Sequence, residues 1–376
     1  MERHRTIILQ TMLRNGLNWG VGMTTRTACK LLICLGLVPV GLALAQTCAT
    51  GDEMDVPTRT GLEATAQGYF GLAAKGDVAG LKQSAIPSVA ESFSGIAAAV
   101  QENQGNFAAA KAAVRGVFAL TVDEPTPGQA SAQPAAQRLE FLCGVFGKSG
   151  QTGSSAVFVL NGLPAGRYAV TILDVVAADG TGKDSARQDG ASKGDAYVVS
   201  FVLQQVAGEW KLGGFYAKAG ESAGHDSAWF AERARAFVAK GQTHNAWFYF
   251  LQARNLATVV PFMSTRETDR LYDEAQKLVP ADLPGEAPME LLAGWKVYKI
   301  RTIFAYGAAG EVNLVVKYDW ADVSDAAKTY AENQAVARAL VAKWPELRDG
   351  FRAIVTRATE ASGKDYGTLV GMGELK

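Results

Sequence analysis

Histidine and cysteine are scarce in this sequence, which contains three histidines and four cysteines among 376 residues. Beyond the first 45 residues only His225 and His244 remain, and each stands near the start of a predicted helix in one antiparallel pair. A helix of that length spans about 20 Å, so we expect the two imidazoles at opposite ends of the pair. Because no cysteine cluster compensates, the sequence predicts no metal site and no cofactor.

An excess of basic charge is also absent, since 37 basic residues balance 37 acidic residues. Cleavage after Ala45 would remove five basic residues and one acidic residue, which leaves 32 against 36 and a net charge of −4. Proteins that bind phosphate backbones need a basic face. The composition therefore gives no reason to expect a nucleic-acid partner.

Complete catalytic motifs are missing as well. The segment Gly180-Thr181-Gly182-Lys183 resembles part of a phosphate loop, but Ala177 replaces the leading glycine and Asp184 follows the lysine. The carboxylates of Asp319 and Asp322 precede a predicted helix, where capping is the favoured role. No catalytic residue is predicted, and the sequence favours a protein that is not an enzyme.

An apolar run of 15 residues, LLICLGLVPVGLALA, follows Lys30 and ends in Ala43-Leu44-Ala45. A basic start, a short apolar core and a small-x-small end are typical of a secretory signal. The run is short for a membrane span of about 20 residues. We therefore expect a signal peptide over residues 1–45, with Met23 as an alternative translation start, and a periplasmic or secreted protein without a transmembrane span after cleavage. The alternative is a buried or anchoring helix.

Two cysteines, Cys48 and Cys143, would remain after cleavage. Cys48 lies just past the apolar run, but Gln46 departs from the small residues that lipidation requires, so a lipoprotein is disfavoured. An exported chain can pair the two thiols in a disulfide. The alternative is a free Cys143 buried in a strand.

In the remaining chain the spacing of apolar residues changes from a helical period to a period of two and back. This pattern predicts an α+β fold. A stretch with three prolines and a glycine, residues 280–288, is typical of a linker. The predicted units are a helix-plus-antiparallel-sheet domain over 56–218, a helical hairpin with a further helix over 224–279 and a small ββαβ domain over 289–376.

The first unit resembles the NTF2-like fold, in which a curved sheet wraps around helices to form a cone. The resemblance rests on the pair Tyr69-Phe70, the step Gly76-Asp77 and the last strand from Glu209 to Tyr216. It implies a pocket inside the cone but no particular activity. Candidate ligand-binding residues in that pocket are Tyr69, Phe70, Trp210 and Tyr216, for which core packing is the alternative role.

The stretch from His225 to Phe262 is the most aromatic part of the chain and resembles one tetratricopeptide repeat. A solenoid needs about three or more repeats, so a single hairpin must dock on its neighbours. The matching positions are Phe230, Phe237, Gly241, Ala246, Phe250 and Ala253.

Four aromatic side chains of this hairpin are candidates for partner binding. An exposed aromatic patch binds a partner chain or a glycan, whereas a helix that is apolar all round is normally buried by its neighbours. We favour burial between the two flanking units. The four residues are Trp229, Trp247, Phe248 and Tyr249.

These features favour a non-catalytic exported interaction or scaffold protein. Its expected partner is another envelope protein or a small ligand. The alternative is a small-ligand-binding protein or enzyme that uses the cone pocket. The combination of segments also resembles an uncharacterised family of exported bacterial proteins, a resemblance that implies no activity.

Overall fold

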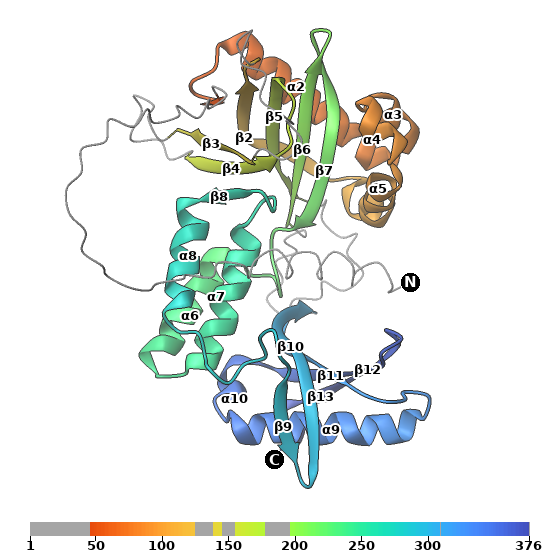
Figure 1. Cartoon of the computed structure of the whole chain (residues 1–376), viewed down its shortest axis with the longest axis vertical. Helices are drawn as coiled ribbons and strands as arrows, with labels where there is room; N and C mark the ends of the chain where they lie inside the picture. The colour runs from red at the N-terminus through yellow and green to blue at the C-terminus, as the bar shows by residue number, and fades with distance from the viewer. Residues whose placement is uncertain (1–45, 125–137, 145–154, 177–195, 309, 376) are drawn as a thin grey trace, which may run out of the picture.

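A computed structural model of the chain describes residues 46–124, 138–144, 155–176, 196–308 and 310–375. It shows an α+β protein with three sheets, which confirms the expected fold class. An N-terminal unit, a group of helices and a C-terminal unit follow one another along the longest axis (Figure 1). The expected signal peptide and the segment Gly180–Lys183 lie outside the described residues.

A five-stranded antiparallel sheet forms the centre of the N-terminal unit, in the order β1-β2-β5-β6-β7. A two-residue turn, Ala207-Gly208, joins its last two strands, and both residues have a positive φ. Such turns match the twist of paired strands. The strands are β1 (Gln46–Thr50), β2 (Lys111–Val122), β5 (Gly166–Val176), β6 (Ala196–Val206) and β7 (Glu209–Ala219).

Four helices cover one face of this sheet (Figure 1). The carboxylate of Asp55 accepts a hydrogen bond from the Thr58 amide at the start of the first helix. Gly76 ends that helix with a φ of 70°, which a residue with a Cβ rarely adopts. The helices are α2 (Val56–Lys75), α3 (Val78–Gln83), α4 (Pro87–Glu91) and α5 (Ser94–Phe107).

A small three-stranded sheet, in the order β3-β4-β8, covers the opposite face. Strands β3 (Arg138–Cys143) and β4 (Ala156–Asn161) belong to the N-terminal unit, but β8 (Met263–Thr265) comes from the segment between two later helices. A disulfide between Cys48 and Cys143 joins β1 to β3. The central sheet is therefore buried on both faces.

Three helices form the middle of the molecule: α6 (Ser227–Ala239), α7 (Thr243–Ala257) and α8 (Arg266–Gln276). Gly241, with a φ of 73°, allows the tight turn between α6 and α7. Ala234, Ala246 and Ala253 are buried, and their small side chains let the two helices approach closely.

A second five-stranded sheet, in the order β13-β12-β11-β10-β9, forms the C-terminal unit with α9 packed on it. Strands β11 and β12 are parallel, and the crossover between them contains α9 and α10. The sequence did not predict β9, which follows the proline-rich segment directly. The elements are β9 (Met289–Ala293), β10 (Lys296–Ala308), β11 (Glu311–Asp319), α9 (Ala326–Lys343), α10 (Leu347–Gly350), β12 (Ala353–Thr359) and β13 (Asp365–Gly371).

The helical hairpin contacts both flanking units. Its buried aromatic residues belong to one hydrophobic core with the C-terminal sheet. On the other side, Lys218 of β7 donates hydrogen bonds to the Thr258 and Leu256 carbonyl oxygens at the end of α7, at 2.7 and 3.3 Å. Burial lowers the pKa of Lys218 to about 8.

Candidate functional site

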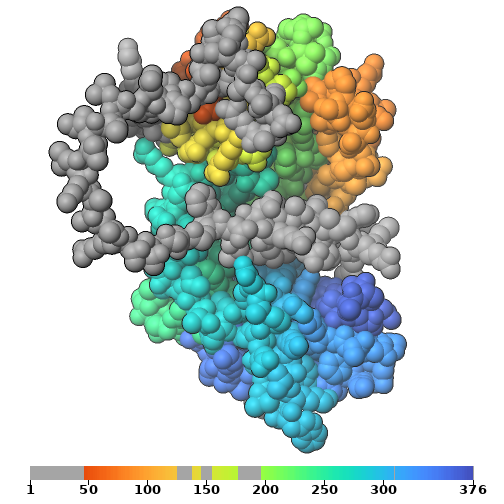
Figure 2. Space-filling view, in the orientation of Figure 1, coloured from red at the N-terminus to blue at the C-terminus, as the bar shows by residue number. Residues whose placement is uncertain are grey.

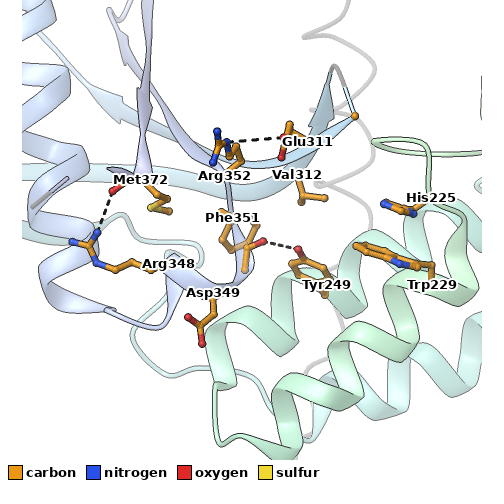
Figure 3. Close-up of a pocket in the computed structure, with 12 residues that line it drawn as sticks. His225, Trp229, Tyr249, Glu311, Val312, Arg348, Asp349, Phe351, Arg352 and Met372 are labelled. Atoms are coloured by element: carbon orange, nitrogen blue, oxygen red, sulfur yellow. Dashed lines mark hydrogen bonds and ion pairs between the residues drawn. The ribbon is translucent and has the colours of Figure 1, made fainter. Parts of the chain in front are cut away.

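A pocket of about 370 Å³ lies where α6 and α7 meet the C-terminal unit, and we call it the junction pocket. Twelve residues line it, and they come from five separate stretches of the chain. In Figure 3, His225 and Trp229 stand on one side of the pocket, and Arg352 and Glu311 stand on the other.

The aromatic wall consists of His225 and Trp229. Their rings are nearly parallel, with centroids 3.7 Å apart and an interplanar angle of 5°. Two backbone hydrogen bonds between Ser222 and His225, at 2.9 and 3.0 Å, fix the chain that carries the imidazole. The carboxylate of Asp226 caps α6 by accepting a hydrogen bond from the Trp229 amide at 2.9 Å. The local chain therefore holds the stacked pair in place before any ligand binds.

Tyr249 of α7 lies between the two sides of the pocket, where its hydroxyl donates a hydrogen bond to the Gly350 carbonyl oxygen. Only 3% of Tyr249 is exposed, and burial raises the pKa of its hydroxyl to about 12. A phenol with that pKa stays protonated near neutral pH. Tyr249 consequently supports the pocket and does not act as a base there.

Arginines and carboxylates form the charged rim. Arg348 donates hydrogen bonds to the carbonyl oxygens of Met372 and Leu375, so its guanidinium is engaged within the protein. Arg352 differs, because its side chain is 74% exposed and the carboxylate of Glu311, the one ion-pair partner that it has among the described residues, lies 4.0 Å away. The Arg352 backbone is fixed, since its amide donates to the Val312 carbonyl oxygen at 2.8 Å. Arg352 is thus the rim cation best placed to meet an anion.

The chemistry that this arrangement offers is stacking and ion pairing. Planar groups stack favourably on an indole, and a guanidinium pairs with carboxylates. Among the residues that the structure describes, no group of three or more His, Cys, Asp or Glu side chains could hold a metal ion.

The second histidine, His244, belongs to a different cluster. Its Nδ1 lies 2.9 Å from a carboxylate oxygen of Glu346, and its Nε2 lies 2.8 Å from one of Asp282. The ring stacks on Trp344 at 4.3 Å, and the indole Nε1 donates to Asp282 at 2.7 Å. Asp282 lies in the expected linker, so this cluster fastens the linker to α7 and to the end of α9.

Asp282 makes this cluster sensitive to acid. Burial alone would raise its pKa, but hydrogen bonds from His244, Trp344 and Lys343 hold the pKa well below its usual value. A depressed carboxylate pKa contributes stability above the unfolded pKa of about 4, and this contribution is lost as the pH falls through the folded pKa.

We therefore expect Asp282→Asn to lower the free energy of unfolding at pH 7. About 1–2 kcal/mol is expected, after discounting for a side chain that is 41% exposed. Urea unfolding should show the difference from wild type shrinking below about pH 4. Asp273→Asn, an exposed change on α8, is the control; an equal loss in that variant would contradict the role of the cluster.

The four residues proposed for the cone do not share one surface. Tyr69 and Phe70 are buried in the core between α2 and the sheet, where the Tyr69 hydroxyl donates to the Trp210 carbonyl oxygen at 2.8 Å. Trp210 is partly buried at the edge of that core. Tyr216 packs against Phe262 near the opposite face, with ring centroids 5.6 Å apart.

The structure separates the four aromatic candidates of the hairpin into two groups. Phe248 and Tyr249 are buried and contact Phe351 of the C-terminal unit, with ring centroids 6.1 and 5.8 Å apart. Trp229 and Trp247 are partly buried, and only Trp229 lines the junction pocket.

Sequence reasoning missed Glu311 and Arg352 of the rim. Neither belongs to a motif, and they reach the pocket because β11 and β12 are neighbours in the sheet. The one local signal was the concentration of aromatic residues around the start of α6, where His225 lies just before the Asp226 cap and Trp229 lies in the first turn.

Within the described part of the chain, no helix combines the length and apolar character needed to cross a membrane.

Known proteins give no further guide to the site. No family model matches this chain, and neither the curated proteins nor the solved structures contain one that is similar to it.

Proposed function

We propose that this chain is a non-catalytic binding protein of the cell envelope, and that its ligand is a small aromatic anion held in the junction pocket. The observation that carries the proposal is the stacked pair His225–Trp229 on one side of the junction pocket, with Glu311 and Arg352, whose side chain is 74% exposed, on the other. The ring of such a ligand would stack on the aromatic pair, and its carboxylate would pair with the guanidinium of Arg352. The volume of about 370 Å³ falls within the range of small-molecule sites.

Export is supported by two independent features. The apolar run before Ala45 has the organisation of a secretory signal. The disulfide between Cys48 and Cys143 suits an oxidising compartment, because cytosolic thiols are kept reduced.

We also propose that the N-terminal unit is NTF2-like and that α6 and α7 form a tetratricopeptide-like hairpin. Helices that cover one face of an antiparallel sheet support an NTF2-like N-terminal unit, and the small buried residues between α6 and α7 support a tetratricopeptide-like hairpin. In this view the hairpin docks on its neighbours and one wall of the resulting junction becomes the binding site. A ligand inside the cone has less support, because Tyr69 and Phe70 are packed in the core.

Isothermal titration calorimetry with benzoate, phenylacetate and indole-3-acetate tests the proposal. We expect at least one acid to bind, and its neutral amide to bind about tenfold more weakly, since one lost ion pair costs about 1.4 kcal/mol. Arg352→Ala should weaken binding of the acid by a similar factor and leave binding of the amide unchanged.

The matched control is Arg338→Ala, which removes an exposed arginine from α9. Absence of binding by all three acids, or equal affinity of the acid for wild type and Arg352→Ala, would refute this ligand class. Melting temperatures of both variants should equal that of wild type, because neither guanidinium is buried.

A further inference from the structure

The turn between β9 and β10 carries a group of exposed apolar side chains. Trp295 is 93% exposed, Leu292 is 63% exposed and Val297 is 56% exposed. Leu292 and Val297 are direct cross-strand partners, so their side chains lie on the same face of the hairpin. We call these three residues the hairpin tip.

The hairpin tip extends away from the body of the protein. The turn reaches past helix α9 at the end of the molecule opposite the N-terminal unit (Figure 1). The same region protrudes at the lower end of the space-filling view (Figure 2). A surface that approaches this end of the molecule would meet the tip first.

The base of the hairpin is firmly anchored. Leu291 and Tyr298, on the inner face, are 2% and 3% exposed. The Tyr298 hydroxyl and the Lys296 ammonium both donate to the Glu332 carboxylate of α9. Gly294 occupies the first position of the two-residue turn with a φ of 62°, a conformation that favours glycine. The chain therefore holds Trp295 outward on a rigid support.

Three lysines lie on the elements next to the tip, and two of them face carboxylates, Lys296 that of Glu332 and Lys299 that of Glu290. Lys296 and Lys299 lie on β10, and Lys328 lies on the helix that packs against β9. Among the described residues, Lys299 and Lys328 form no ion pair, although Glu290 stands opposite Lys299 in the register. A tryptophan among aliphatic residues and lysines suits the boundary of a bilayer, where the indole lies at the headgroups and lysines attract anionic lipid.

The size of the tip argues against a protein partner. A tryptophan buries on the order of 150–250 Å² of surface. Three side chains therefore fall well short of the roughly 800 Å² that each partner buries in a stable protein interface. A small, convex, apolar tip fits a lipid surface better than it fits a protein surface.

We propose that the hairpin tip inserts into the headgroup region of bilayers that contain anionic phospholipid, and so holds the protein at a membrane surface. The tip is independent of the junction pocket, so the two proposals fail or succeed separately.

Flotation with vesicles of phosphatidylcholine and phosphatidylglycerol (3:1) tests this inference. The protein is used without residues 1–45, because residues 31–45 form an apolar run and the described fold begins at Gln46. We expect wild type to float with the vesicles and Trp295→Ala to bind at least about tenfold more weakly. Trp295→Phe should retain most of the affinity, and vesicles of phosphatidylcholine alone should bind less protein.

Leu369→Ser is the matched control, because Leu369 is also 63% exposed but lies on the opposite edge of the sheet. Brominated lipids provide a local measurement, since they should quench wild-type fluorescence more than that of Trp295→Phe. Failure of wild type to float overturns the proposal. The hairpin tip would then bind to another protein instead of a lipid surface. Equal binding by wild type and Trp295→Ala, or equal quenching with Trp295→Phe, also overturns the proposal.

Discussion

Replacement of both Cys48 and Cys143 by alanine is expected to lower the free energy of unfolding by about 4–5 kcal/mol. The two residues are 95 positions apart, so the bond closes a long loop and restricts the unfolded chain strongly. In the folded state it fastens the edge strand β1 to β3, across the core between the two sheets. Urea unfolding monitored by circular dichroism measures the loss.

A reductant supplies the control for this variant. Wild type treated with reductant should approach the stability of the double variant, whereas reductant should leave the double variant unchanged. Intact mass should also show that reduction adds two hydrogens to the wild-type pair. A wild-type protein whose stability and mass do not respond to reductant would contradict the bond.

Phe248→Ala is expected to destabilise the protein by about 3–5 kcal/mol, the usual cost of removing a buried aromatic side chain. Phe248 is 1% exposed and belongs to the core that α7 shares with the C-terminal unit. The loss should appear as a lower midpoint in thermal and urea unfolding. A partner-binding role for this residue would instead leave the melting curve unchanged.

Leu251→Ala is the matched change on the same helix, because Leu251 is 36% exposed. We expect it to cost less than about 1 kcal/mol. Comparable losses for the two variants would mean that helix propensity, and not core packing, determines the result. The pair therefore separates burial at the junction from an exposed aromatic patch.

Long periodic segments carried most of the fold information in the sequence. The strands β5, β6 and β7 and the helix α6 depend on local signals: alternation, the Ala207-Gly208 turn, and Asp226 at the helix start. Each of these signals acts over a few residues. The α+β class therefore followed from the sequence.

The short strands were beyond the reach of such patterns. Strand β8 contains three residues, Met263–Thr265, too few to show a period. Strand β9 contains five residues, directly follows a proline-rich stretch and pairs with β10 alone across the turn at Gly294. Both strands form because a neighbouring strand offers an open edge, which is a property of the tertiary fold.

The junction pocket illustrates the same limit. His225 and Trp229 attract attention as aromatic residues, but Glu311 and Arg352 are ordinary charged residues of a solvated surface. Their importance arises when the crossover through α9 brings β12 beside β11. A chain without a local motif can thus form a site that only the packing of its units defines.

The origin of β8 affects how the chain reaches its native state during synthesis. Strand β4 ends at Asn161. Strand β8, which pairs with the edge of β4 that does not contact β3, begins at Met263, about a hundred residues later. At a ribosomal rate of about 5–20 residues per second, the edge of β4 stays unpaired for roughly 5–20 s. An unpaired edge is a template for joining a second copy of the chain. Nascent protein that stalls before residue 263 should therefore be the species that aggregates, although the globular unit before it is nearly complete.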